Sequence, residues 1–295
     1  MAPVPNWPRI TEPELLERLT MDDRQFGAYV ASLLAALPPR TYEAAYLTRA
    51  IGYPWSRPEG SFMVSDGKVT LLEGMGAEER DRSIRHFTAA EAGRLPVIAI
   101  GSNAAPKVLE TKFAHFPGEE DRVVLALTGS LHDFDVGVAA QPALYGSMPA
   151  TIFPSPGTAV RATVLWVTPA QFTQLAWSEI SYRLGRLRAR FEVDESDTEL
   201  DEVLVFVSRF GAFCVDGEPV ALAAVPATGR TARSLTQEQA LDAAAALAIG
   251  PQATAEMLVR AIFEDLGRLG PRLVETVNRE SRQFASERWT AFSGG

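Results

Sequence analysis

The chain has 295 residues, of which 46 % are hydrophobic and 22 % are charged, a composition typical of globular rather than disordered proteins. Its net charge of −9 argues against general binding to nucleic acid or to anionic membranes, because both require a basic surface. The sequence has no apolar run of the roughly 18 residues that a membrane span requires, and no secretory leader is evident at its start. The single cysteine, Cys214, cannot form an internal disulfide. We therefore expect a soluble, cytoplasmic protein.

Residues 1–92 are expected to form a mostly helical N-terminal cap that includes a β-hairpin. Thr11 and Glu14 suggest a capping box at the start of a first helix. Apolar residues then recur at helical spacing from Phe26 to Leu37, before two prolines end the pattern. The other elements expected here are a helix at 41–50 and hairpin strands at 61–64 and 68–72.

Residues 93–230 change in character to short apolar runs rich in β-branched and aromatic residues, which are typical of strands. Two helices are expected between them, near 106–113 and over 169–187, and Pro154 to Gly157 is expected to form a turn. The expected strands lie at 97–100, 123–127, 151–153, 159–167, 203–207 and 212–215. Strands with few, irregular helical insertions favour a small mixed β-barrel in an α+β protein over a doubly wound sheet.

Residues 231–295 are expected to form a C-terminal helical extension. An alanine-rich helix is expected to end at Gly250-Pro251, a second at Gly270-Pro271, and a third would follow. Apolar stripes on such helices are typical of core or dimer packing, so we expect any homo-oligomer to form through these helices.

A strand-end loop is the first candidate functional element. Ile100, Gly101, Ser102, Asn103 and Ala104 follow the first strand of the middle region, where backbone N–H groups can hold a carboxylate or a developing oxyanion. Gly101 would allow close approach of a substrate. The same residues could instead form a turn in which Ser102 or Asn103 caps the next helix.

Glu179 is the candidate acid/base residue. Most glutamates are solvated on a helix face, but the neighbours of Glu179 are largely apolar, and a carboxyl group in such a setting can exchange a proton near neutral pH. Arg183 could anchor a substrate carboxylate or simply suit the negative end of a helix dipole. Tyr145 and Tyr182 are candidate hydroxyl donors, although aromatic residues are more often core.

The sequence contains no motif for a metal site, a nucleotide-binding site or a serine hydrolase. The three histidines and Cys214 have no metal-ligand spacing, and we found neither a phosphate-binding loop nor a dinucleotide fingerprint. Ser102 and Ser147 do not lie in the Gly-x-Ser-x-Gly motif of serine hydrolases. We therefore expect no metal and no organic cofactor.

Four segments follow one another over about residues 96–210: Ile100-Gly-Ser-Asn103, Gly129-Ser-Leu131, Tyr145 to Val160 and Leu175-Ala-Trp-Ser-Glu179. Their order resembles that of the gamma-glutamylcyclotransferase-like family. The resemblance implies a small mixed β-barrel of that type, whose loop amides bind the substrate while Glu179 moves protons. Two positions depart from the family pattern: Ile100 replaces a loop tyrosine, and Ala176 replaces an aspartate.

The function implied is cleavage of a γ-glutamyl or similar small amide by intramolecular cyclisation, without metal or cofactor. Alternatives are acyl transfer or hydrolysis of the same kind of amide. A non-catalytic binding protein on the same fold is a further alternative, suggested by Ile100 and Ala176. The helical regions could also carry a separate partner-binding function.

Overall fold

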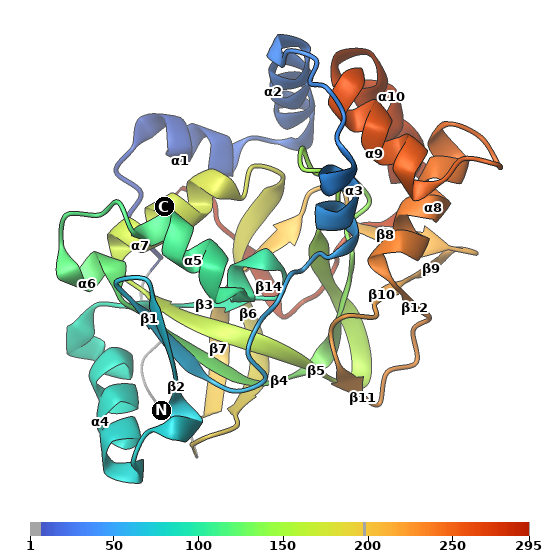
Figure 1. The fold of residues 1–295 in the computed structure, drawn as a ribbon. Coiled ribbons are helices and arrows are strands. Elements are labelled where there is room, and N and C mark those ends of the chain that lie inside the picture. Colours follow the sequence, from blue (N-terminus) through green and yellow to red (C-terminus); the bar gives the residue numbers. More distant parts are fainter. Residues whose placement is uncertain (1–6, 197–198, 295) are drawn as a thin grey trace.

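The computed structural model describes residues 7–196 and 199–294, apart from the side chains of residues 268, 269, 271 and 272. Its centre is a closed barrel of five strands (Figure 1). These are β3 (Leu95–Ala99), β4 (Val124–Val138), β5 (Ala150–Val167), β6 (Tyr182–Val193) and β7 (Glu199–Ser208). They pair in the order β3-β5-β4-β6-β7, and β7 pairs with β3 in parallel while the other pairs are antiparallel. The expected α+β class and small mixed barrel are therefore confirmed.

Successive residues of a barrel strand enter two different hydrophobic cores, because side chains alternate across a strand. Leu125 and Leu127 of β4 join the core that also contains residues of the C-terminal helices. Val124 and Ala126 join a second core, shared with helices that follow β3 and β5. Burial on both faces explains why these strands are continuous apolar runs in the sequence.

Most of the helices lie beside the barrel in two groups, and α4 lies apart from both (Figure 1). The described helices are α1 (Pro13–Thr20), α2 (Asp23–Ala36), α3 (Ala44–Ile51), α4 (Ala77–Thr88), α5 (Pro106–Phe113), α6 (Glu119–Arg122), α7 (Pro169–Ser178), α8 (Gln237–Ala248), α9 (Ala255–Glu264) and α10 (Leu266–Arg279). One group holds α5 and α7, with α1 beside α7; the other holds α8, α9 and α10, with α2 against α10. Among the residues that the structure describes, no helix combines the length and the apolarity needed to cross a membrane.

The N-terminal elements largely follow the expectations from the sequence. The helices α2 and α3 are present, and β1 (Phe62–Ser65) and β2 (Lys68–Leu71) form the expected hairpin, with β1 also pairing with β4. The capping box at Thr11 is wrong, because α1 begins after Glu12 and has no side-chain cap. The Glu12 carboxylate instead accepts a hydrogen bond of 2.5 Å from Trp177 Nε1.

Strand β5 is continuous where a turn was expected at Pro154 to Gly157. Phe153 and Pro154 pair with Asp135 and Phe134 of β4, next to a register shift at Asp133. Residues 155–158 of β5 lie opposite Asp133 alone, so β5 bulges at this point, and both Asp133 (φ 64°) and Gly157 (φ 79°) adopt left-handed backbone.

The helix expected over 169–187 is wrong in its second half. Helix α7 ends at Ser178, and β6 begins at Tyr182. From Arg186 to Phe191, arginines alternate with apolar residues, and Leu187, Ala189 and Phe191 are buried. This period of two is the pattern of a strand with one solvated face.

The C-terminal region also differs from the expectation. The helical pattern breaks at Asp265 rather than at Gly270-Pro271, and α10 continues through that pair. Gly270 packs against α2, so tertiary contact keeps the backbone helical despite its weak local propensity. After α10 the chain returns to the sheets through two strands that were not expected, at 281–282 and 289–291.

The remaining short strands are β8 (Ala212–Val215), β9 (Glu218–Pro219), β10 (Ala221–Leu222), β11 (Ala227–Thr228), β12 (Ser234–Leu235), β13 (Ser281–Arg282) and β14 (Trp289–Ala291).

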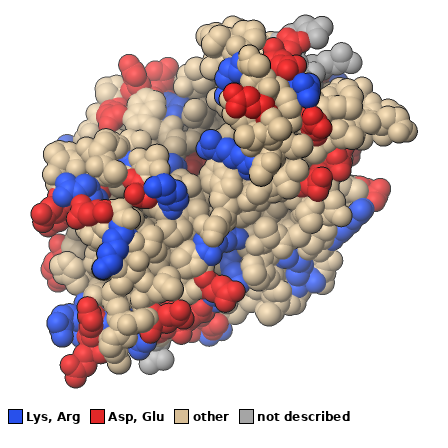
Figure 2. Space-filling view, viewed as in Figure 1, with Lys and Arg blue, Asp and Glu red and all other residues tan. Residues whose placement is uncertain are grey.

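Charged side chains of both signs are scattered over the face shown in Figure 2 and leave broad uncharged areas between them.

Candidate active site

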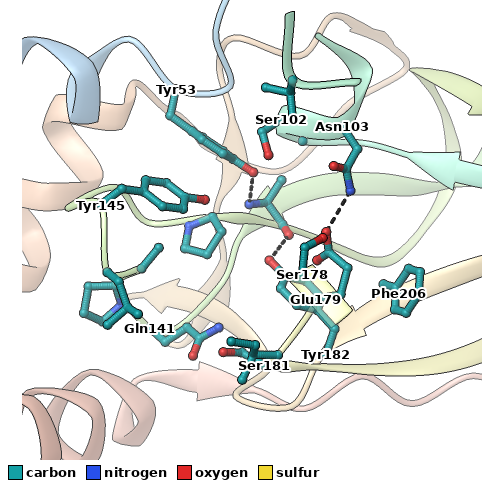
Figure 3. Close-up of a pocket in the computed structure, with 18 of the residues that line it drawn as sticks. Tyr53, Ser102, Asn103, Gln141, Tyr145, Ser178, Glu179, Ser181, Tyr182 and Phe206 are labelled. Carbon is teal, nitrogen blue, oxygen red and sulfur yellow. Dashed lines mark hydrogen bonds between the residues drawn. The ribbon is translucent and has the colours of Figure 1, made fainter. Parts of the chain in front are cut away.

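A cavity of about 870 Å³ lies between the barrel and the two groups of helices. The end of β3, the start of α5, the segment after α7 and the loop that precedes β5 line one part of it (Figure 3). Residues of α2 and α10 line another part. Elements that are far apart in the sequence therefore meet around a single hollow.

Glu179 lies in this cavity at the C-terminal end of α7. Thr168 and Gln171 form a reciprocal capping box that starts the helix, and the Glu179 N–H closes it by donating to Leu175 O at 3.1 Å. The side chain is half-buried. Its Oε1 accepts a hydrogen bond of 2.7 Å from Asn103 Nδ2 (Figure 3).

Lys112 fixes the orientation of the Asn103 amide. Its Nζ donates to Asn103 Oδ1 and to Ser178 Oγ, each at 2.6 Å. Because an ammonium group only donates, Asn103 must turn its oxygen to Lys112 and its NH₂ group to Glu179. Burial lowers the pKa of Lys112, while the charge of Glu179 opposes that shift.

The strand-end loop lines the same cavity as Glu179. Ile100, Gly101, Ser102 and Asn103 face the cavity, whereas Ala104 is fully buried and does not line it. Helix α5 begins after Ala105 without a side-chain cap, so Asn103 and Ser102 do not cap it. The Asn103 side chain binds Glu179 instead.

Gly101 makes room for a tyrosine from the N-terminal region. A Cβ atom at Gly101 would lie 2.2 Å from the hydroxyl oxygen of Tyr53, so any side chain there would force Tyr53 or the loop to shift. The Tyr53 hydroxyl accepts a hydrogen bond of 2.8 Å from Ala150 N. The Tyr182 hydroxyl donates to Ala150 O, also at 2.8 Å.

The tyrosines Tyr53, Tyr145 and Tyr182 all border the cavity. Tyr145 stacks on Tyr53 with ring centroids 6.3 Å apart. Burial raises the pKa of each of these hydroxyls above its ordinary value of 10.0, because the charged form is desolvated. They are therefore neutral hydrogen-bonding groups at physiological pH.

The structure places Arg183 outside this cavity. It lies on β6, where its guanidinium pairs with Asp23 and borders a smaller hollow of about 340 Å³.

Arg18 holds the C-terminal end of α7, next to Glu179. The buried Arg18 of α1 donates to the carbonyl oxygens of Ala176 and Trp177, at the end of α7.

Sequence reasoning missed Tyr53, Lys112 and Arg18. The proline- and aromatic-rich segment around Tyr53 was a signal of unusual local structure, but not of contact with Gly101. Lys112 and Arg18 lie on short helices whose patterns gave no sign of a role.

No protein-family model matches this sequence, and no curated protein matches it. Among solved structures, a gamma-glutamyl cyclotransferase aligns with 17 % identity and a TM-score of 0.31, over 39 % of this chain and 66 % of its own length. An uncharacterised protein from Homo sapiens aligns with 14 % identity and a TM-score of 0.30, over 66 % of this chain and 93 % of its own length. At these values the interpretation of the site rests on its own residues.

Proposed function

We propose that this protein is an enzyme that cleaves a γ-glutamyl or similar small amide by intramolecular cyclisation, with Glu179 as general acid and base. One observation carries the proposal: the Glu179 carboxylate lies in the cavity, 2.7 Å from Asn103 of the loop that follows the first barrel strand. The loop and the acid, which the sequence motifs pair, thus border one volume that a small molecule could occupy.

In the proposed reaction, the α-amine of the substrate attacks its own γ-carbonyl carbon. A new N–C bond forms and Glu179 accepts the proton that the amine loses. The original amide C–N bond then breaks, and Glu179 returns that proton to the departing amine. The products are 5-oxoproline and a free amine, and the carboxylate ends in its starting state.

The contacts around Glu179 support this role. Asn103 holds Oε1, so we assign proton transfer to Oε2. Lys112 holds Asn103 in turn and places a positive charge close to the acid. Holding the acid in one orientation reduces the reorganisation needed during the reaction.

The cavity wall supports the binding part of the proposal. Gly101 and Ser102 bring backbone into the cavity, and backbone N–H groups suit a carboxylate or an oxyanion. Ile100 departs from the family pattern by lacking a hydroxyl. We assign that polar contact to Tyr53, whose hydroxyl lies against Gly101.

The test is the release of amine from a panel of γ-glutamyl amines and peptides by wild type and by Glu179→Gln. Glutamine keeps the size and hydrogen-bonding capacity of the side chain but cannot exchange the proton, so kcat should fall about 10²–10⁴-fold. The control is Glu192→Gln, at a β6 carboxylate that binds His132. Undiminished turnover by Glu179→Gln would remove the assigned role.

Product analysis separates the proposed cyclisation from the related reactions. Cyclisation yields 5-oxoproline, whereas hydrolysis yields free glutamate and acyl transfer yields a new amide. Binding of the amides without any amine release would favour a non-catalytic protein on this fold.

A further inference from the structure

The cavity has two chemically different parts. Asn103, Lys112 and Glu179 occupy the polar part, beside the strand-end loop. The other part is lined by aliphatic side chains from α2 and its C-terminal end, from α10 and from the loop between β4 and β5. We call this second part the α2–α10 wall, and its members are Val30, Leu33, Leu37, Leu144 and Val274.

The α2–α10 wall is held by close helix packing. A Cβ atom at Gly270 of α10 would lie 3.0 Å from Leu34 Cδ1 of α2, so the absence of a side chain at Gly270 lets the two helices approach. Residues 30, 33, 34 and 37 share one face of α2, since three- and four-residue steps return to the same side of a helix. All four line the cavity, and Leu34 is the one that is buried.

The apolar side chains of the wall remain exposed. Leu33 and Leu37 are each 38 % exposed and Leu144 is 41 % exposed. These are three of the eight large hydrophobic side chains that are exposed in the described part of the chain, and they gather at one cavity. Single exposed leucines are ordinary, whereas a cluster that continues a polar site marks a binding surface.

The cavity is also larger than a glutamyl group alone would fill. Pockets of roughly 300–1,000 Å³ enclose drug-sized ligands, and this cavity, at about 870 Å³, is in the upper part of that range. A glutamyl group beside Asn103 and Glu179 would leave the α2–α10 wall uncovered.

We infer that the amine side of the amide substrate carries an extended apolar group, which lies along the α2–α10 wall. This inference rests on the proposed function, because Glu179 and the strand-end loop define where the glutamyl group sits. Its occupant is the alkyl or aromatic part of the same small molecule. Cleavage of the amide would then release a hydrophobic amine.

A ladder of γ-glutamyl methylamide, butylamide and octylamide tests the inference. Burial of the chain should raise kcat/KM about fourfold for each methylene group until the wall is covered. The variant Leu33→Gln should lose most of the preference for octylamide over methylamide. The matched control, Leu247→Gln, changes a leucine that is 41 % exposed on α8 and does not line the cavity, and it should keep the preference.

Calorimetric binding of the same three amides to Glu179→Gln distinguishes failure of this inference from failure of the proposed reaction. Tighter binding with chain length, even without any turnover by wild type, upholds the apolar wall while the reaction fails. A Kd and a kcat/KM that do not vary with chain length overturn the inference even if amine is released, and so does undetectable binding of the octylamide. A dimer that Leu33→Gln dissociates would also overturn it, because the wall would then bind a second copy of the chain.

Discussion

Asn103 Nδ2 donates a 2.7 Å hydrogen bond to Glu179 Oε1, although the two residues are 76 positions apart in the sequence. The contact links the loop after β3 to the end of α7, so the two halves of the candidate site are joined directly. Lys112 completes the arrangement by fixing which side of the Asn103 amide faces the acid.

Removal of the Asn103 amide should impair turnover more than folding. Asn103→Leu deletes a hydrogen bond to a charged group, worth about 1.5–3 kcal/mol, so kcat should fall about 10- to 100-fold. Steady-state kinetics and thermal unfolding measure the two effects. Asn278→Leu is the control, because that amide binds Phe210 O and does not line the cavity. A normal kcat in Asn103→Leu would contradict the positioning role.

The charge of Lys112 should limit activity at alkaline pH. Burial lowers its pKa from the ordinary value of 10.5, and the Glu179 carboxylate opposes the shift only in part. The ammonium form, which donates to Asn103 and Ser178, is therefore lost as pH rises through a value below 10.5. We predict that kcat declines on that alkaline side.

Two variants check the origin of this decline. Lys112→Met should have a low kcat at every pH and no decline that follows the wild-type curve. Lys68→Met, at an exposed position on β2, should keep the wild-type profile. An alkaline decline that survives in Lys112→Met would assign it to a different group.

The barrel was predictable because its strands are buried on both faces. The run at 123–127 begins one residue before β4, and the runs at 159–167 and 203–207 lie inside β5 and β7. Their apolar character follows from the two cores. Strand β6 is absent from the expected strands, because its arginines resemble the basic end of a helix as much as the solvated face of a strand. Its period of two was the available signal.

The candidate site was only partly predictable, for a different reason. The order of the sequence motifs predicts that the loop at Gly101 and the acid at Glu179 belong to one site, and both line one cavity. Tyr53, Lys112 and Arg18 were not named, because each reaches the site through tertiary packing of a helix or loop. The local sequence around these residues does not predict which side chains tertiary packing will bring together.

Gly101 and Tyr53 should be energetically coupled. Gly101→Ala forces its Cβ against the Tyr53 hydroxyl, and such overpacking should cost about 1–3 kcal/mol of unfolding free energy. Tyr53→Phe should cost about 1–3 kcal/mol because the buried Ala150 N–H loses its acceptor. The double variant should cost less than the sum, since phenylalanine removes the clashing oxygen.

Urea unfolding of the two single variants and the double variant measures this coupling. Gly27→Ala is the control and should raise the unfolding free energy. A Cβ there meets no atom within 4 Å, and alanine favours the helix by about 0.5–1 kcal/mol. Strictly additive costs at Gly101 and Tyr53 would contradict the close contact between them.

Arg18 should affect turnover by holding the end of α7. Its guanidinium donates to the carbonyl oxygens of Ala176 and Trp177 in the last turn of α7, and Glu179 follows that turn directly. Arg18→Met should lower both the unfolding temperature and kcat, because the acid loses its fixed position relative to Asn103. Arg94→Met is the matched control, since Arg94 also donates to carbonyl oxygens, of Val123 and Trp166, but reaches α7 only at Gln171 in its first turn and does not line the cavity. Both variants should lose stability, by about 1–3 kcal/mol, whereas only Arg18→Met should lose kcat when assayed well below its unfolding temperature. Equal kcat values in the two variants would show that Arg18 serves the fold and not the position of the acid.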